Sequence, residues 1–177
     1  MMLYRYRNFL RIAAPVFTIL LALAPSSATP APVGSQASGD ASATVVQPLS
    51  INVINPFLVF GKAASSGSDG TIVVTANAGS SSRSSTGGAS IISSPFGAAV
   101  FFISGETGSP VNVVLPGSIL VNSGANSMTV DSFQSSPPSP YNQPASGQFL
   151  SVGGTLHVAA NQPPGSYAGT FNVSVNY

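Results

Sequence analysis

The feature that most constrains the fold of this chain is the two-residue period of its apolar residues. Leu49, Ile51 and Val53 alternate with polar residues, and residues 171–177 alternate in the same way at the other end. Side chains of a β-strand point alternately to opposite faces, so each segment predicts a strand with one buried and one exposed face. No apolar stripe with the 3.6-residue period of a helix is long enough to compete. The sequence therefore predicts an all-β domain.

Further short apolar runs lie between these two segments, separated by clusters of Gly, Pro, Ser and Asn that favour turns. Gly153 and Gly154 are interpreted as one such turn. Residues 79–88 and 135–147, rich in Ser, Gly and Pro, are predicted to be exposed loops. About eight to nine short strands at this spacing predict an antiparallel β-sandwich or barrel. The runs are 71–76, 98–104, 111–115, 118–121, 127–133, 148–152 and 155–160.

The N-terminal segment is expected to be a secretory signal peptide, residues 1–28. Three arginines within residues 5–11 precede a mostly apolar run, 12–24, and small residues follow. Cleavage is expected after Ala28, because cleavage after Ala24 would leave a proline just beyond the broken bond. The apolar run is shorter than the roughly 20 residues that span a bilayer. The sequence therefore predicts export, with no stable membrane span after cleavage.

The mature chain is expected to begin with a flexible arm, residues 29–43, and to continue as one domain, residues 44–177. The arm is almost entirely Ala, Pro, Ser, Gly and Thr, a composition that buries too little apolar surface to fold. Only 5% of the whole chain is charged, against about 25% in an ordinary soluble domain. Removal of the signal peptide leaves two basic and four acidic residues, a net charge of −2. This balance offers no electrostatic footprint for nucleic acid.

Residues that could carry catalysis or hold a metal are scarce. The chain has no cysteine and one histidine, His157, which alternates with apolar neighbours and is expected on a strand surface. A role as general base or metal ligand would need further partners that the nearby sequence lacks. Glu106 and Asp131 would form an acid–base pair only if the fold brought them together. We therefore expect no enzyme activity, no catalytic residues, no cofactor and no metal.

A family resemblance is carried by five segments, residues 47–52, 102–106, 111–116, 150–156 and 165–177. They are similar to a family of secreted bacterial domains that is catalogued as a domain of unknown function and described as fimbrial-subunit-like. The resemblance covers roughly residues 44–177. It implies an exported immunoglobulin-like β-sandwich that passes through the periplasm and ends at the cell surface or outside the cell.

The order of parts also resembles that of pilins of chaperone and usher systems. The resemblance implies partners that are copies of the chain or other surface subunits, together with a periplasmic chaperone and an outer-membrane usher. Such subunits lack a strand, and an extended arm of a neighbour fills the open edge by β-strand addition. The candidate arm is residues 43–53, although its alternation fits a first strand paired within its own domain equally well.

Two sets of residues are candidates for this assembly. The strand-addition anchors are Val45, Leu49, Ile51 and Val53, and the C-terminal assembly strand presents Phe171, Val173, Val175 and Tyr177. The expected function is a non-enzymatic structural subunit, a fimbrial or surface-fibre protomer. The alternative is a monomeric periplasmic or extracellular module that recognises carbohydrate or protein through residues 79–88 and 135–147. An incomplete sandwich favours the first, and a closed domain with a polar cleft favours the second.

Overall fold

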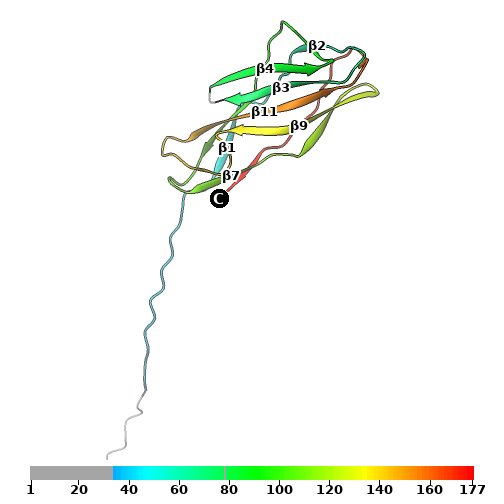
Figure 1. Cartoon of the computed structure of the whole chain (residues 1–177). Helices are drawn as coiled ribbons and strands as arrows, with labels where there is room; N and C mark the ends of the chain where they lie inside the picture. The colour runs from blue at the N-terminus through cyan, green and yellow to red at the C-terminus, as the bar shows by residue number, and fades with distance from the viewer. Residues whose placement is uncertain (1–33, 78) are drawn as a thin grey trace, which may run out of the picture. The chain divides into compact units, whose positions relative to one another are not determined.

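The computed structural model describes residues 34–77 and 79–177, and this part of the chain is all-β (Figure 1). It contains twelve strands, β1 to β12, and no helix. The prediction of an all-β domain is confirmed. Consequently, no helix long and apolar enough to cross a membrane occurs in these residues. The predicted signal peptide, residues 1–28, and the first part of the predicted arm, residues 29–33, lie outside the described residues.

Residues 43–177 form one compact unit. Ahead of it, the described residues 34–42 form no strand and are exposed, as expected for a segment made of small and polar residues. All strand pairs of the compact unit are antiparallel.

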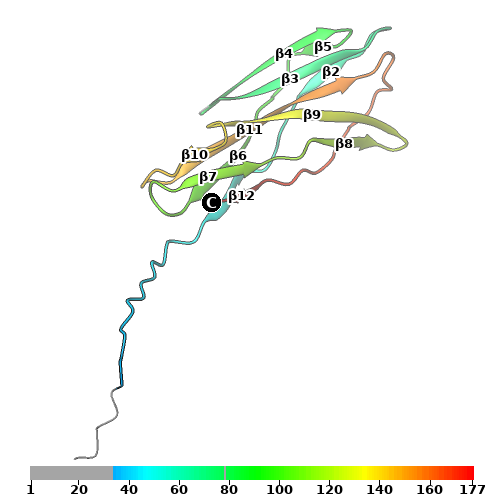
Figure 2. The same ribbon diagram turned by 60° about the horizontal axis from the view of Figure 1, so that its bottom comes forward.

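Seven strands form the main sheet, which curls into a half-barrel (Figure 2). Its order is β1-β6-β11-β3-β4, and the β8–β9 hairpin joins it through β9, which pairs with β11. The strands are β1 (Ser50–Asn55), β3 (Gly70–Asn77), β4 (Ser80–Gly87), β6 (Ala99–Ser104), β8 (Ser118–Ser123), β9 (Asn126–Ser136) and β11 (Gln148–Val158).

The remaining strands are short. β7 (Pro110–Val114) lies between β10 (Tyr141–Asn142) and β12 (Ser174–Asn176) in a three-stranded sheet. β2 (Lys62–Ala64) and β5 (Ser90–Ile92) form a separate two-stranded sheet. The total exceeds the expected eight to nine strands because β2, β5 and β10, with two or three residues each, are too short to show an alternating pattern.

β11 holds the main sheet together. Residues 148–152 pair with β6 and residues 154–158 pair with β3, while residues 151–157 pair with β9 along the opposite edge. The predicted turn at Gly153 and Gly154 is therefore wrong, since the runs on either side form one strand. The glycines have another role: a Cβ at Gly153 would overlap with the carbonyl oxygen of Val74 on β3, so the missing side chain allows the two backbones to approach.

Two hydrophobic clusters form the core. The first joins β3, β9 and the end of β11, and the second joins β6 to the start of β11. Residues from β7 and from the C-terminal segment pack against the second cluster, so this part of the core has a cover opposite the sheet. The buried members are Ile72, Ala89, Val130, Leu156 and Val158 in the first cluster, and Ala99, Phe101, Ile103, Leu150 and Val152 in the second.

The prediction of a loop at residues 79–88 is wrong, because Ser80–Gly87 form β4. The strand pairs residue for residue with β3, and the hydroxyls of Thr86 and Ser82 contact those of Thr71 and Thr75. Serine has a weak intrinsic preference for strands, and cross-strand contacts override it here. The loop prediction at residues 135–147 holds in part, since β9 extends to Ser136 and β10 occupies only two positions.

The C-terminal segment is a strand over a shorter range than its alternation predicts. β12 covers only Ser174–Asn176, and residues 169–173 belong to no strand. The alternation itself is present in three dimensions: Phe171, Val173 and Val175 are partly buried against the second cluster, and the polar residues between them are exposed. The side chains of this segment therefore pack on the core as those of a strand would. Most of its backbone, however, has no strand partner among the described residues.

Candidate functional site

Two strand edges face the second core cluster. β1 is the last strand at one end of the main sheet, and β12 is the last strand of the three-stranded sheet. The two are neighbours, and within residues 34–77 and 79–177 no strand pairing joins them. Leu49 and Ile51 reach the cluster from the β1 side, while Phe171 and Val173 reach it from the C-terminal side. The fold thus places an open strand edge on each side of one apolar cluster.

The predicted anchor residues do not all behave alike. β1 pairs with β6 within its own domain, and Leu49 and Ile51 pack against the second cluster of the same domain. Val45 and Val53 are exposed, with 96% and 61% of their surface accessible. Of the predicted C-terminal residues, Phe171, Val173 and Val175 pack on the cluster, and Tyr177 is 42% exposed. The structure therefore gathers five of the eight residues around one cluster.

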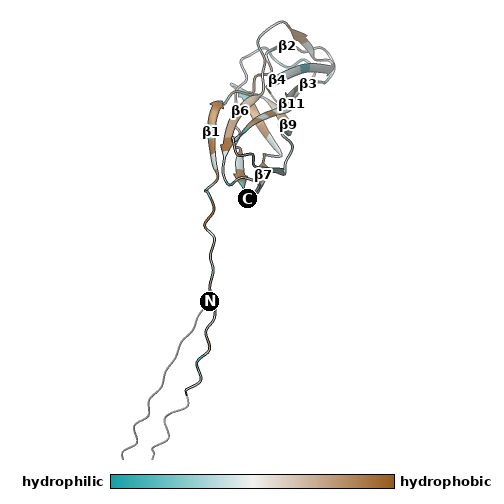
Figure 3. Ribbon diagram, turned by 90° about the vertical axis from the view of Figure 1, so that its left-hand side faces the viewer, coloured by the Kyte–Doolittle hydropathy of each residue, from teal (hydrophilic) through white to brown (hydrophobic). Residues whose placement is uncertain are grey.

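An exposed apolar run continues from the edge strand. Val53, Ile54 and Phe57 are 61%, 57% and 67% exposed, and the pairing of β1 with β6 shifts register between Val53 and Asn55. Figure 3 shows β1 as a brown, hydrophobic strand at the margin of the folded unit. Contiguous apolar residues on the surface of a small domain mark an interaction site or an aggregation hazard.

A three-residue contact, here called the tyrosine clip, ties the C-terminal residue to the start of β1. The Tyr177 hydroxyl donates to the carbonyl of Gln47 at 2.7 Å and accepts from the backbone N–H of Glu106 at 2.6 Å. The N–H of Gln47 in turn donates to the Glu106 carboxylate at 2.9 Å. No local pattern predicts this clip, because its members lie up to 130 positions apart.

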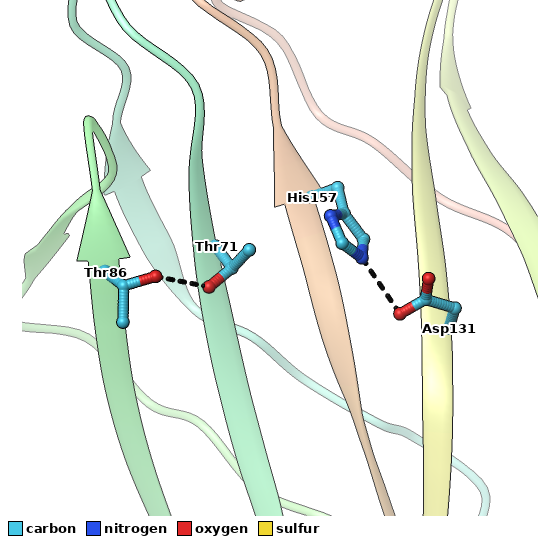
Figure 4. A network of polar contacts seen from close by, with 4 residues as sticks. All are labelled: Thr71, Thr86, Asp131 and His157. Atoms are coloured by element: carbon cyan, nitrogen blue, oxygen red, sulfur yellow. Dashed lines mark hydrogen bonds and ion pairs between the residues drawn. The ribbon is translucent and has the colours of Figure 1, made fainter.

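The second candidate is a polar network on the main sheet (Figure 4). Thr86, Thr71, His157 and Asp131 lie on the neighbouring strands β4, β3, β11 and β9. The hydroxyls of Thr71 and Thr86 are 2.7 Å apart, and His157 Nε2 lies 2.9 Å from Asp131 Oδ1. The His157 side chain is 48% exposed. The structure thus confirms its expected position on the surface of a strand.

The partner of His157 was not predictable from its neighbours in sequence. Pairing of β9 with β11 brings Asp131 to it. The hydrogen bond from His157 lowers the pKa of Asp131 below its usual 3.8, and this effect outweighs burial, which acts in the opposite direction. Glu106 forms a hydrogen bond with Gln47 instead. Glu106 and Asp131, considered above as an acid–base pair, therefore have different partners.

The network consists of two hydrogen-bonded pairs of side chains. Among the described residues, His157 forms a side-chain hydrogen bond with Asp131 and none with a hydroxyl group. Nor do the described residues contain a group of three or more His, Cys, Asp or Glu side chains placed to hold a metal ion. The side chains of this network offer hydrogen-bond donors and acceptors.

A family comparison covers both candidates. The matching family model is described as "Domain of unknown function (DUF4402)" and spans residues 49–177, well over half of the chain. The chain belongs to the DUF4402 family. The resemblance to a domain of unknown function is thereby confirmed, and the DUF4402 domain includes both strand edges and the polar network. No curated protein and no solved structure matches the chain.

Proposed function

We propose that this DUF4402 protein is a non-enzymatic structural subunit that is exported, displayed at the cell surface and assembled into a fimbria-like fibre by β-strand addition. The observation that carries the proposal is the pair of open edges, β1 and the C-terminal segment, on either side of one apolar cluster. Two edges that both lack a partner present unpaired N–H and C=O groups to an incoming strand.

An added strand would complete the domain. We interpret the β1-β6-β11 part of the main sheet and the β10-β7-β12 sheet as two layers of an immunoglobulin-like sandwich. A strand between β1 and residues 169–173, beyond the point where β1 and β12 are neighbours, would form backbone hydrogen bonds on both sides. It would also cover the cluster side chains that are only partly buried now. The exposed side chains of Val53 and Ile54 lie on the same edge and would lose contact with water.

The proposed donor is the N-terminal arm of a second copy. Because β1 already pairs with β6 of its own domain, the donated residues lie ahead of β1, within residues 36–46. This segment is exposed and forms no strand of its own. Its residues alternate between two types, as a strand with one buried face requires. The small or apolar set is Ala37, Gly39, Ala41, Ala43 and Val45, and the polar set is Gln36, Ser38, Asp40, Ser42 and Thr44.

The size of these residues suits the site. Leu49, Ile51, Phe171 and Val173 already fill the space over the cluster in part, so an incoming strand with small side chains fits where bulky ones would clash. An exported subunit with an open edge also needs protection before assembly. A periplasmic chaperone that covers the edge and an outer-membrane usher that orders the subunits would supply it.

Assembly can be tested with two neighbouring substitutions in the arm of the exported chain. Val45→Asp places a charge on the proposed buried face and should reduce the assembled fraction at least tenfold, because an unpaired buried carboxylate is costly. Thr44→Asp adds the same charge on the opposite face and should leave assembly intact. Light scattering of the purified protein, and heat-dissociable ladders on a gel, measure the assembled fraction. A strictly monomeric wild type, or equal effects of the two substitutions, would overturn the proposal.

A further inference from the structure

A polar cavity of about 420 Å³ opens on the main sheet beside the polar network. It lies where β3 and β9 begin and where β4 and β11 end. Its polar lining includes Asp69, Thr71, Thr86, Thr129, His157 and Gln162, and its apolar residues include Met128 and Val158. The volume falls within the range of about 300 to 1,000 Å³ that is usual for small-molecule sites.

The polar side chains of the cavity are held in place by one another and by the backbone. Asp69 Oδ1 accepts a hydrogen bond of 2.7 Å from the N–H of Ala160. Gln162 Nε2 donates to the hydroxyl of Tyr167 at 2.8 Å. The Thr71–Thr86 and His157–Asp131 contacts fix the other side of the cavity (Figure 4). A ligand therefore meets groups whose orientation is already set, which reduces the entropy lost on binding.

These groups keep unused hydrogen-bonding capacity. A threonine hydroxyl has one donor and two acceptor sites, and a carboxylate oxygen accepts more than one hydrogen bond. The contacts of Thr71, Thr86 and Asp69 use only part of that capacity. The cavity thus offers donors and acceptors close together, while the side chains of Met128 and Val158 belong to or pack against the first core cluster.

The charge of the lining restricts the ligand. The two basic residues of the described chain, Lys62 and Arg83, are not among the lining residues, and Arg83 donates instead to the carbonyls of Phe60 and Ile92. A phosphate, sulfate or carboxylate ligand would meet Asp69 with no lysine or arginine to balance it. The described lining also has no Phe, Tyr or Trp ring on which a flat aromatic ligand would stack.

We propose that this cavity is a binding site for a neutral saccharide. Closely spaced ring hydroxyls match the mixed donors and acceptors of the lining. The site does not depend on assembly, because its residues lie on or next to β3, β4, β9 and β11, whereas the open edges lie on β1 and the C-terminal segment. In an assembled fibre, each copy would present one site, so weak individual binding would be reinforced by multivalency.

The test is saturation-transfer NMR with the exported chain and four free sugars. Galactose, mannose and N-acetylglucosamine are the neutral probes, and N-acetylneuraminic acid is the anionic probe. We expect saturable binding of at least one neutral sugar with a Kd of about 1 to 10 mM, and at least tenfold weaker binding of the anionic sugar. Absence of saturable binding by all three neutral sugars up to about 50 mM would overturn the proposal. Equal binding of the anionic sugar would do the same.

Two variants on one strand locate the binding. Thr86→Val keeps the shape of the side chain and removes the hydroxyl, so it should weaken binding about fivefold, as the loss of one hydrogen bond does. Ser84→Ala lies on the same exposed face of β4, outside the cavity, and should leave the Kd unchanged. A second cavity variant, His157→Gln, should also weaken binding. Equal Kd values for the wild type, Thr86→Val and His157→Gln would contradict the assignment.

Discussion

At the scale of single residues, two tyrosines of the domain show what a hydroxyl group contributes to stability. The hydroxyl of Tyr177 forms the two hydrogen bonds of the tyrosine clip. The hydroxyl of Tyr141 is buried and has no hydrogen-bond partner in the described residues, and burial raises the pKa of Tyr141 above its usual 10.0. Because a hydrogen-bonded hydroxyl stabilises a fold and an unpartnered buried one does not, the same substitution should act differently at the two positions.

We predict that Tyr177→Phe lowers the free energy of unfolding by about 1 to 2 kcal/mol, since it removes both hydrogen bonds of the clip. Tyr141→Phe should leave this free energy unchanged or raise it by up to about 1 kcal/mol, since it removes a buried group that lacks a partner. Urea denaturation of the two variants, each compared with the wild type, measures the difference. Equal losses in both variants would contradict the contacts described for Tyr177.

At the scale of strands, Arg83 connects β4 to the small β2–β5 sheet. Its guanidinium donates to the carbonyl of Phe60 at 2.8 Å and to that of Ile92 at 3.1 Å, and it lies 4.8 Å from the centre of the Phe96 ring. Gly61 makes this approach possible: its φ is 76°, and a Cβ there would overlap with Arg83 Nη1. One side chain therefore fixes a sheet that has only three residues in each strand.

Replacement of Arg83 by lysine should loosen this small sheet selectively. A lysine ammonium cannot reproduce the fork of donors, so we predict a loss of about 1 to 2 kcal/mol and faster amide hydrogen exchange in β2 and β5. Exchange in β6 and β11 should change less, because the side-chain hydrogen bonds of Arg83 go to Phe60, Ser94 and Ile92 and reach neither strand. Ser84→Ala, one position away on the exposed face, serves as the control. Uniformly faster exchange throughout the domain would contradict this role for Arg83.

The same scale shows which parts of the fold the sequence predicts. Alternation is a local signal, so the strands at 71–76, 98–104 and 127–133 are found within a few positions of their predicted bounds. β4 has no apolar alternation, and its pairing with β3 stabilises it instead. The contact between His157 and Asp131 joins two strands across 26 positions, and no pattern within either strand indicates it. The alternation of apolar residues within one strand can be recognised in the sequence, whereas the pairing of distant strands depends on the whole sheet.

At the scale of the whole molecule, the scarcity of charge affects how copies would meet. The described residues carry two basic and four acidic side chains, and the proposed contact between copies consists of backbone hydrogen bonds and apolar side chains. Such contacts depend little on the Debye length, which falls from about 10 Å at 0.1 M salt to about 3 Å at 1 M. Ionic repulsion between copies is also small at a net charge of this size.

Assembly, where it forms as proposed, should therefore resist salt. We predict that the assembled fraction stays constant or rises slightly between about 0.1 M and 1 M sodium chloride, because screening removes only a weak repulsion. Analytical ultracentrifugation of the exported chain across this range provides the measurement, with Val45→Asp as the monomeric reference. Dissociation of the assembly at high salt would indicate ion pairs at the contact and would contradict strand addition as its basis.

The central position of β11 sets the order in which the domain can form. The pairs β1–β6, β3–β4 and β8–β9 are joined into one sheet only by residues 148–158. Those residues come late in the chain, so the pairing that unites the three earlier pairs requires residues 148–158 to be present. Because β11 contacts all three pairs across long stretches of sequence, the domain should fold slowly for its size, since such distant contacts form only after long loops have closed.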